Sequence, residues 1–177
     1  MKKIIVIPDS FKGSLSSLEV CNAIEEGILK VFKDAKIKKI PVADGGEGTV
    51  DSILYATGGK IKKVKVRNPL GEIIDNNKAV IEMAEASGLT LVKEKNPLKS
   101  STYGTGELIK DAIENGIKEI LIGIGGSATN DCGIGMANAL GYKFFDENGN
   151  ELEATAENMI KIAKIDGSNI YKKIFDV

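Results

Sequence analysis

Short apolar runs alternate along the chain with longer segments in which apolar residues return at helical spacing. Residues 3–7 form the first run, and the next segment places apolar side chains at positions 20, 21, 24, 28, 31 and 32, the spacing of one helix face. The pattern predicts strands at 3–7, 37–43, 60–66, 80–83, 120–122, 142–145 and 174–177. It predicts helices at 16–33, 107–115 and 155–162, and a further helix that contains residues 53–54 and ends at Gly58.

This alternation predicts an α/β fold with a largely parallel sheet, whose ligands usually gather at the carboxyl ends of the strands. Each polar or glycine-rich loop in the chain follows a strand or precedes a helix, and Ser16-Ser17-Leu18-Glu19 matches a capping box. Residues 60–66 alternate Lys with Ile and Val, and Asn68-Pro69-Leu70-Gly71 has turn chemistry. We expect a hairpin there, at a sheet edge.

A glycine-rich loop follows the apolar run at 120–122. Gly123, Gly125 and Gly126 precede more polar residues, at 127–131, than the capping of one short helix requires. Glycines let a ligand approach the backbone, and an anion fits at a helix N-terminus. A helix terminus contributes only about 0.3–1 kcal/mol, whereas micromolar binding needs about 8 kcal/mol. The loop therefore needs further binding surfaces elsewhere in the chain.

Composition narrows the choice of partners. The 177 residues are 42% hydrophobic and 28% charged, with a formal net charge of −1. Lysines and acidic residues are interspersed, which gives no basic face for nucleic acid and no polybasic membrane patch. Only four consecutive apolar residues lead up to Pro8, and no later segment approaches a membrane span. We expect a cytoplasmic protein that acts on a small molecule; the sequence carries no signal of its oligomeric state.

The chain contains no histidine. This excludes a Ser-His-Asp triad, histidine-ligated zinc and an imidazole general base. The two cysteines show no metal-binding spacing, and Cys21 falls within a helical apolar stripe expected in the core. Any chemistry must rest on carboxylates, lysine, hydroxyl groups, backbone dipoles or a bound ion.

One interpretation of the glycine-rich loop is a dinucleotide site. Gly123-x-Gly125-x-x-Ala128 fits the G-x-G-x-x-G/A fingerprint, and Asp146 ends the next strand at a suitable distance for a ribose contact. This interpretation favours an NAD-dependent oxidoreductase. Against it, Asp131 would put a carboxylate near the pyrophosphate, and Asp146-Glu147-Asn148-Gly149 has the composition of a tight turn.

A second interpretation is phosphoryl transfer, which needs positioning and charge neutralisation by Mg²⁺ and by Lys or Arg. Asp44 and Glu47 flank Gly45-Gly46 and can hold a metal through water without histidine. Lys12 is the cation within these loops, so it is the natural partner for phosphate or carboxylate charge. The only arginine, Arg67, ends a lysine-rich strand and is expected at the surface. No Walker A motif is present.

Five motifs stand in order along the chain. They are Asp9-Ser10-Phe11-Lys12-Gly13-Ser14-Leu15-Ser16, Pro41-Val42-Ala43-Asp44-Gly45-Gly46-Glu47-Gly48-Thr49, Ile81-Glu82-Met83-Ala84 with Ala86-Ser87-Gly88-Leu89, Tyr103-Gly104-Thr105-Gly106-Glu107-Leu108-Ile109, and Gly123-Ile124-Gly125-Gly126-Ser127-Ala128-Thr129-Asn130-Asp131. Together they resemble the glycerate kinase family, which makes phosphoglycerate from D-glycerate and ATP. The resemblance covers essentially all 177 residues, and about the N-terminal half of a family member.

The resemblance implies two different α/β domains with largely parallel sheets, both incomplete in this chain, and an active site in the cleft between them. Residues 1–83 would be the N-terminal part of a discontinuous domain, and residues 84–177 the start of a second, flavodoxin- or Rossmann-like domain. It also implies Mg-ATP as the phosphoryl donor and D-glycerate as the acceptor. Whether the 2- or the 3-hydroxyl is phosphorylated stays open.

Roles for individual residues follow from matching the motifs. Four residues would be catalytic: Asp9, Lys12, Asp44 and Asp131. Of these, Asp44 or Asp131 would accept the proton of the glycerate hydroxyl. The residues expected to bind substrate or nucleotide are Ser10, Gly13, Gly45, Gly46 and Glu47 on one wall, and Thr102, Gly104, Thr105, Gly125, Gly126, Ser127, Thr129 and Asn130 on the facing wall. Asp44 and Glu47 are the candidate metal ligands.

Two features depart from the family pattern. Cys132 and Ile134 stand where the family usually has small residues, and Phe175-Asp176-Val177 looks like the beginning of a family motif whose continuation is absent. We therefore expect the chain to be an N-terminal portion, not competent as a kinase on its own. A non-catalytic nucleotide-binding fragment stays an alternative.

Overall fold

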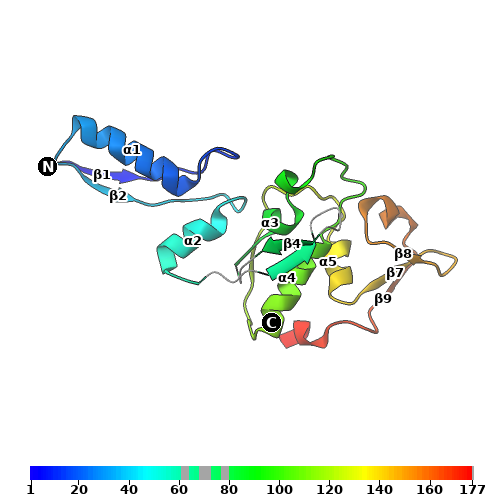
Figure 1. Ribbon diagram of the computed structural model, residues 1–177. Helices are drawn as coiled ribbons and strands as arrows, with labels where there is room; N and C mark the ends of the chain where they lie inside the picture. Colours follow the sequence, from blue (N-terminus) through cyan, green and yellow to red (C-terminus); the bar gives the residue numbers. More distant parts are fainter. Residues whose placement is uncertain (61–63, 68–72, 77–79, 177) are drawn as a thin grey trace. The chain divides into compact units, whose positions relative to one another are not determined.

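A computed structural model describes residues 1–60, 64–67, 73–76 and 80–176 of the chain (Figure 1). The chain divides into two compact units, Met1–Lys60 and Ile61–Val177. Each unit contains one pair of neighbouring parallel strands, β1 with β2 in the first unit and β5 with β6 in the second. Each unit is described by itself below.

The first unit is built on β1 (Lys3–Val6) and β2 (Lys36–Lys39), joined by helix α1 (Ser17–Val31). The capping box predicted at the start of α1 is present: Ser16 Oγ accepts from the Glu19 N–H, and the Glu19 carboxylate accepts from the Ser16 N–H. α1 lies along the two strands (Figure 1). Cys21 is fully buried there, as the apolar stripe predicts.

Main-chain pairing in the first unit continues past the ends of both strands. Ile40 N–H donates to Val6 O at 2.9 Å, and Val42 N–H donates to Pro8 O at 3.3 Å. The strand predicted at 37–43 is shorter than expected, because β2 ends at Lys39. Residues 40–42 nevertheless continue beside the segment that follows β1. Helix α2 (Thr49–Thr57) follows and ends at Gly58, as predicted.

The second unit begins with the predicted hairpin, β3 (Val64–Arg67) antiparallel to β4 (Ile73–Asn76). The expected turn at 68–71 lies outside the described residues. β5 (Val80–Glu82) leads into α3 (Met83–Ser87) and the 3₁₀ turn η1 (Leu89–Leu91). β5 pairs parallel with β6 (Leu121–Gly123), as predicted for that apolar run.

Helix α4 (Tyr103–Glu114) carries the core of the second unit. Seven buried apolar side chains cluster along it: Val66, Ile81, Ala86, Leu108, Ile109, Ile113 and Leu140. Ile122 packs against this cluster, whereas Leu121 is 58% exposed. Successive strand residues face opposite sides, so the apolar run predicted as a strand at 120–122 is buried on one face only.

A close approach fixes β3 against α4. A Cβ added to Gly104 would lie 1.7 Å from the Arg67 carbonyl oxygen, so only glycine fits there. Glu107 accepts from the Arg67 N–H at 2.6 Å, and its other oxygen lies 3.3 Å from Arg67 Nη1. The Arg67 guanidinium also lies 4.7 Å from the centre of the Tyr103 ring. Arg67 is thus partly exposed, as expected, but it serves to fasten the hairpin.

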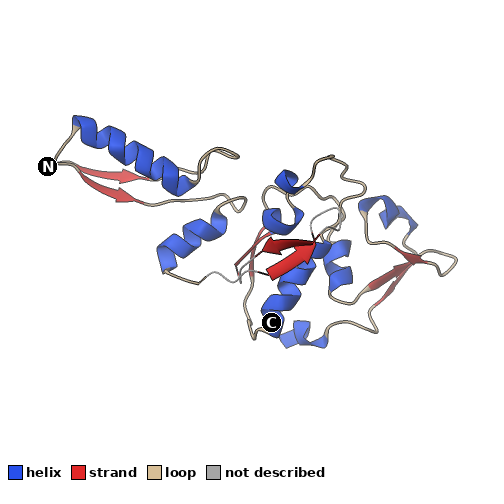
Figure 2. Cartoon of the chain, in the orientation of Figure 1, coloured by secondary structure: helices blue, strands red, loops and turns tan. Residues whose placement is uncertain are grey.

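The remaining elements are α5 (Ile134–Ala139), β7 (Lys143–Phe145), β8 (Glu151–Leu152), η2 (Ala156–Lys161), β9 (Lys164–Asp166) and η3 (Lys172–Asp176). The three strands form a small antiparallel sheet in the order β8-β7-β9 (Figure 2). Two expectations need correction here. The segment at 155–162 forms a 3₁₀ helix rather than an α-helix, and the strand-like run at 174–177 falls largely in η3.

The described sheets are thus mixed in direction: β1-β2 and β5-β6 are parallel, whereas β3-β4 and β8-β7-β9 are antiparallel. Short turns permit only antiparallel neighbours, which limits the expected parallel sheet to the first two pairs. The compact units divide after Lys60, whereas the expected domain boundary follows Met83. That boundary concerns a domain completed by both chain ends and stays a prediction. Within the described residues, no helix is long and apolar enough to cross a membrane.

Candidate functional site

Two predicted catalytic residues meet at the carboxyl ends of β1 and β2. Lys12 lies in the loop after β1 and Asp44 in the loop after β2, and Lys12 Nζ is 3.4 Å from Asp44 Oδ2. The two side chains are 62% and 56% exposed. Parallel neighbours send their following loops out at the same edge, and this brings together residues that are 32 positions apart.

The Asp44 loop is held by its own backbone. Gly46 N–H donates to Asp44 Oδ1 at 3.0 Å, and Gly45 has a φ of +93° that favours glycine. The Gly46 N–H, followed by the Lys12 ammonium, lowers the pKa of the Asp44 carboxyl below its ordinary value. Asp44 is therefore a carboxylate at neutral pH. Glu47, the other candidate metal ligand, is exposed in the same loop.

The loop after β1 presents Lys12 on a small turn. Phe11 and Leu15 exchange main-chain hydrogen bonds, and Gly13 between them has a φ of +73°. Asp9 is exposed and accepts from the Ser10 N–H at 2.6 Å. The Ser10 Oγ is buried and has no hydrogen-bond partner among the described residues. The first motif and the Asp44 motif therefore form one continuous surface region at the strand ends.

Asp131 has different surroundings, in the second unit. Its side chain is 1% exposed, and Oδ2 accepts from Thr102 N at 2.8 Å, Thr102 Oγ1 at 2.8 Å and Gly135 N at 3.1 Å. Oδ1 accepts from Gly133 N at 3.2 Å. Asp131 thus joins the start of α4 to the start of α5. This geometry suits a structural link and gives little support to the predicted role as a general base.

The hydroxyl- and glycine-rich approach to α4 also lies in the interior. Thr105 is 1% exposed and its Oγ1 lies 2.8 Å from Ser87 Oγ. Thr102 is 2% exposed and its Oγ1 also accepts from the Met136 N–H. Gly104 is packed against the β3 backbone. The contacts of these three predicted binding residues hold α4 in place, and their role in binding stays a prediction.

The glycine-rich loop after β6 is tied to the segment after β5. Leu89 N–H donates to Gly126 O at 3.0 Å, and Ala128 N–H donates to Ser87 O at 2.8 Å. Within the loop, Ser127 Oγ lies 2.7 Å from Thr129 Oγ1 and accepts from the Thr129 N–H. The surface of this loop is shared among the half-buried and exposed residues Gly125, Gly126, Ser127, Thr129 and Asn130. The loops of two parallel neighbours again meet.

The dinucleotide interpretation loses its ribose contact in the structure. Asp146 accepts from the N–H groups of Asn148 and Asn150 and from Asn150 Nδ2. Asn150, through its side chain and then its backbone, is the main cause of a lowered pKa at Asp146. The residue closes the turn between β7 and β8. Moreover, among the described strands β7 pairs with β8 and β9, whereas a dinucleotide fold would place β7 beside β6.

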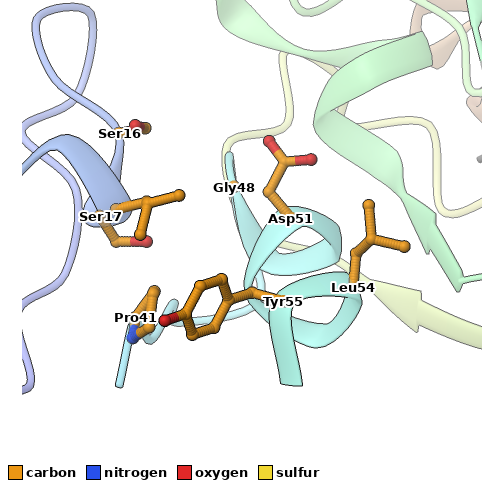
Figure 3. A pocket seen from close by; sticks show the side chains of 8 residues that line it. Ser16, Ser17, Pro41, Gly48, Asp51, Leu54 and Tyr55 are labelled. Carbon is orange, nitrogen blue, oxygen red and sulfur yellow. The ribbon is translucent and has the colours of Figure 1, made fainter. Parts of the chain in front are cut away.

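A cavity in the first unit was not anticipated from the sequence. It has a volume of about 310 Å³ and is lined by Ser16, Ser17, Leu18, Pro41, Gly48, Asp51, Leu54 and Tyr55 (Figure 3). Its walls come from the start of α1, the end of the β2 segment and one face of α2. The spacing of Asp51, Leu54 and Tyr55, i to i+3 and i+4, was the available signal that they share a helix face.

Comparison with known proteins identifies the family. A model of the glycerate kinase family matches residues 4–177. The chain belongs to this family. It is 48% identical over 187 residues to a glycerate kinase of Halalkalibacterium halodurans, 49% over 185 residues to one of Bacillus subtilis, and 47% over 184 residues to the glycerate 2-kinase of Escherichia coli. These matches confirm the resemblance carried by the five motifs.

The glycerate kinase family also supplies a structural neighbour. A crystal structure of a putative glycerate kinase 2 from Salmonella typhimurium matches with a TM-score of 0.79 and 44% identity, over 99% of this chain and 50% of that chain. The three relatives named above are covered over 48–49% of their length, while 98–100% of this chain is matched. The chain therefore spans about half the length of the family members that it matches.

Proposed function

We propose that the protein carrying this chain transfers the γ-phosphate of ATP to a hydroxyl of D-glycerate. The observation that supports this most directly is the contact between Lys12 and Asp44, 3.4 Å apart at the ends of two parallel strands. Phosphoryl transfer asks a protein chiefly for positioning and for opposite charge near the phosphates. Lys12 supplies the cation, and Asp44 supplies a carboxylate that stays ionised at neutral pH.

The ion pair is well suited to exchange partners. Both side chains are more than half exposed, and exposed pairs of this kind contribute little to stability. Separating them to admit a substrate therefore has a small cost. Lys12 would then approach a phosphate or the glycerate carboxylate, and Asp44 would accept a hydrogen bond from the attacking hydroxyl or contact a metal-bound water.

The residues present fit Mg²⁺ as the ion that accompanies ATP. No cluster of three or more metal-ligating side chains occurs among the described residues, but Mg²⁺ commonly uses one or two carboxylates together with waters and substrate phosphates. Asp44 and Glu47 are the carboxylates of the exposed loop and would hold it. When bound, the ion would neutralise phosphate charge.

The second unit would contribute a further binding surface through the loop at 125–130. Its glycines and hydroxyl groups suit contacts with phosphate oxygens or with glycerate. Asp131, Thr102, Gly104 and Thr105 would act by positioning this loop and α4, since their contacts are internal.

The test is ADP release from Mg-ATP, with and without D-glycerate, by the 177-residue chain and by the product of its whole open reading frame. Glycerate-dependent release by the latter supports the proposal, and phosphorus NMR of the product then distinguishes the 2- from the 3-phosphate. Release by the short chain as well would mean that both substrates bind within these residues. If the product of the whole reading frame binds ATP but releases no ADP at any glycerate concentration, the kinase proposal is wrong and a nucleotide-binding role remains.

A further inference from the structure

We propose that the cavity of the first unit, the α1–α2 pocket lined by the eight residues named above, binds the adenine base of the nucleotide. The proposal rests on the proposed function and assigns one part of the substrate to one place. The volume of about 310 Å³ lies at the lower end of the range for small-molecule pockets, about 300–1,000 Å³. That size suits a base rather than a whole nucleoside triphosphate.

The charge of the lining favours a base over the other ligands of the reaction. Asp51 is its one ionisable carboxylate, and no lysine or arginine is among the eight lining residues. A phosphate or the carboxylate of glycerate would meet a like charge and no cation there. The exocyclic amino group of adenine, in contrast, donates hydrogen bonds that a carboxylate accepts. Asp51 already makes an interaction within the chain, but two carboxylate oxygens can accept several hydrogen bonds at once.

The remaining lining supplies the other features that a purine needs. Tyr55 presents an aromatic ring beside Pro41, with Leu54 on the same helix (Figure 3). Flat rings gain from stacking on such a surface. Ser16 Oγ donates to the Glu19 carboxylate at 2.7 Å, and Ser17 Oγ lies 3.4 Å from Ser52 Oγ. These two hydroxyls, on the opposite side of the pocket, therefore offer lone pairs that can accept from the adenine amino group.

The pocket adjoins the loop that carries Asp44. Gly48 lines the pocket four residues after Asp44, and its carbonyl accepts from both the N–H and the hydroxyl of Ser52 at 3.0 Å. Gly46 O accepts from the N–H and hydroxyl of Thr49 at 3.2 and 2.8 Å. The loop is therefore fastened to α2 on both sides. A base in the pocket leaves the ribose and phosphates to extend along this loop toward Lys12.

Substitution of Asp51 tests the assignment through base preference. Asp51→Asn keeps the size of the side chain but replaces a carboxylate oxygen with an amide that can donate to the O6 of guanine. In the product of the whole reading frame, we expect KM for ATP to rise at least tenfold, and the ratio of kcat/KM for ATP over GTP to fall at least tenfold. KM for D-glycerate should change less than twofold. Asp34→Asn makes the same change of charge at an exposed position of the same unit and should leave all three values unchanged within twofold.

A binding measurement keeps this proposal separate from the kinase proposal. Titration of adenosine into the 177-residue chain, followed by saturation-transfer NMR, should show contact with the base protons, and Tyr55→Ala should weaken that contact at least fivefold. Circular dichroism of each variant checks that it folds. Adenosine binding without kinase activity would keep the pocket and overturn the kinase. The pocket assignment is wrong if Asp51→Asn and Tyr55→Ala both fold and bind ATP and adenosine as tightly as the unchanged protein. It is also wrong if only KM for D-glycerate rises. If the variants lose stability and nothing else changes, the pocket is a packing surface for another part of the protein and not an adenine site.

Discussion

Removal of the Asp131 carboxylate should destabilise the second unit strongly. Its side chain is 1% exposed and accepts four hydrogen bonds, three of them from the buried residues Thr102 and Gly135. In Asp131→Ala these three donors lose their partner inside the protein. An unsatisfied buried donor costs about 1–3 kcal/mol, and partial relaxation brings the sum toward the lower end. We expect a loss of about 3–5 kcal/mol, among the largest effects of single substitutions.

Thermal unfolding followed by circular dichroism measures this effect. Each kcal/mol shifts the melting temperature by roughly 2–4 °C for chains of this length, so Asp131→Ala should lower it by about 6–20 °C. Asp131→Asn should be milder, because the amide can turn its carbonyl oxygen toward the three donors at Oδ2 and lose only the bond from Gly133. Asp146→Ala is the matched control. Asp146 accepts three hydrogen bonds, one fewer than Asp131, at the exposed turn between β7 and β8.

The reasoning rests on burial, so the comparison between the two aspartates decides it. If Asp131→Ala lowers the melting temperature no more than Asp146→Ala does, the four contacts of Asp131 do not carry the stability assigned to them. If Asp131→Asn is as damaging as Asp131→Ala, negative charge matters more than the number of acceptors. Either result would reopen a direct role for the Asp131 carboxylate in the reaction.

Three further predictions concern the two units separately. Carbon-detected NMR should place the Asp44 pKa below the ordinary aspartate value. Lys12→Met should raise that pKa only in part, because the hydrogen bond from the Gly46 N–H is the main cause of the lowered value. The contribution of Asp44 to stability is present above the pKa of the unfolded state and is lost as the pH falls through the lower pKa of the folded state. Asp44→Asn in the product of the whole reading frame should reduce turnover at least tenfold while the melting temperature stays within 2 °C, which follows from a contact made in the reaction rather than in folding. Gly104→Ala places a methyl group against the Arg67 carbonyl and should lower the free energy of unfolding by about 3 kcal/mol or more. Gly27→Ala adds a methyl group in open space on α1 and should raise the free energy of unfolding by about 0.5–1 kcal/mol. Denaturant unfolding measures both changes.

The sequence predicts the local elements well where one short-range interaction determines them. The capping box at Ser16 and the helix end at Gly58 each depend on a few neighbouring residues, and both occur as predicted. The hairpin of β3 and β4 also follows from local turn chemistry. The segment at 155–162 was misassigned because its apolar spacing fits a 3₁₀ turn as well as an α-helix, and packing of the surrounding chain selects between them.

The sequence assigns catalytic and binding roles to the candidate site residues without regard to their burial, and the structure separates these residues by burial. Thr102, Thr105 and Asp131 have the composition of a ligand-binding motif, yet Thr102 pairs with Asp131 and Thr105 pairs with the Ser87 hydroxyl. Sequence cannot distinguish a hydroxyl group that meets a ligand from one that meets a buried carboxylate. The α1–α2 pocket was missed for the opposite reason: Asp51 and Tyr55 lie outside the glycine-rich motifs, and only the tertiary fold brings α2 near Ser16 and Ser17 at the start of α1.

The loops that follow the two parallel strand pairs, β1-β2 and β5-β6, are held together in different ways. In both units, the loops that follow neighbouring parallel strands are joined, by an exposed ion pair at Lys12 and Asp44 in the first unit and by main-chain bonds around Gly126 in the second. An exposed pair contributes little to stability and can exchange its partner for a substrate. In the second unit, Ala128 N–H donates to the carbonyl of the fully buried Ser87, and leaving a buried acceptor unpaired is costly. The first unit therefore has the adaptable charges that phosphoryl transfer requires. The second has a loop whose shape is fixed before any ligand binds, and a fixed loop suits recognition, because little conformational freedom is lost on binding.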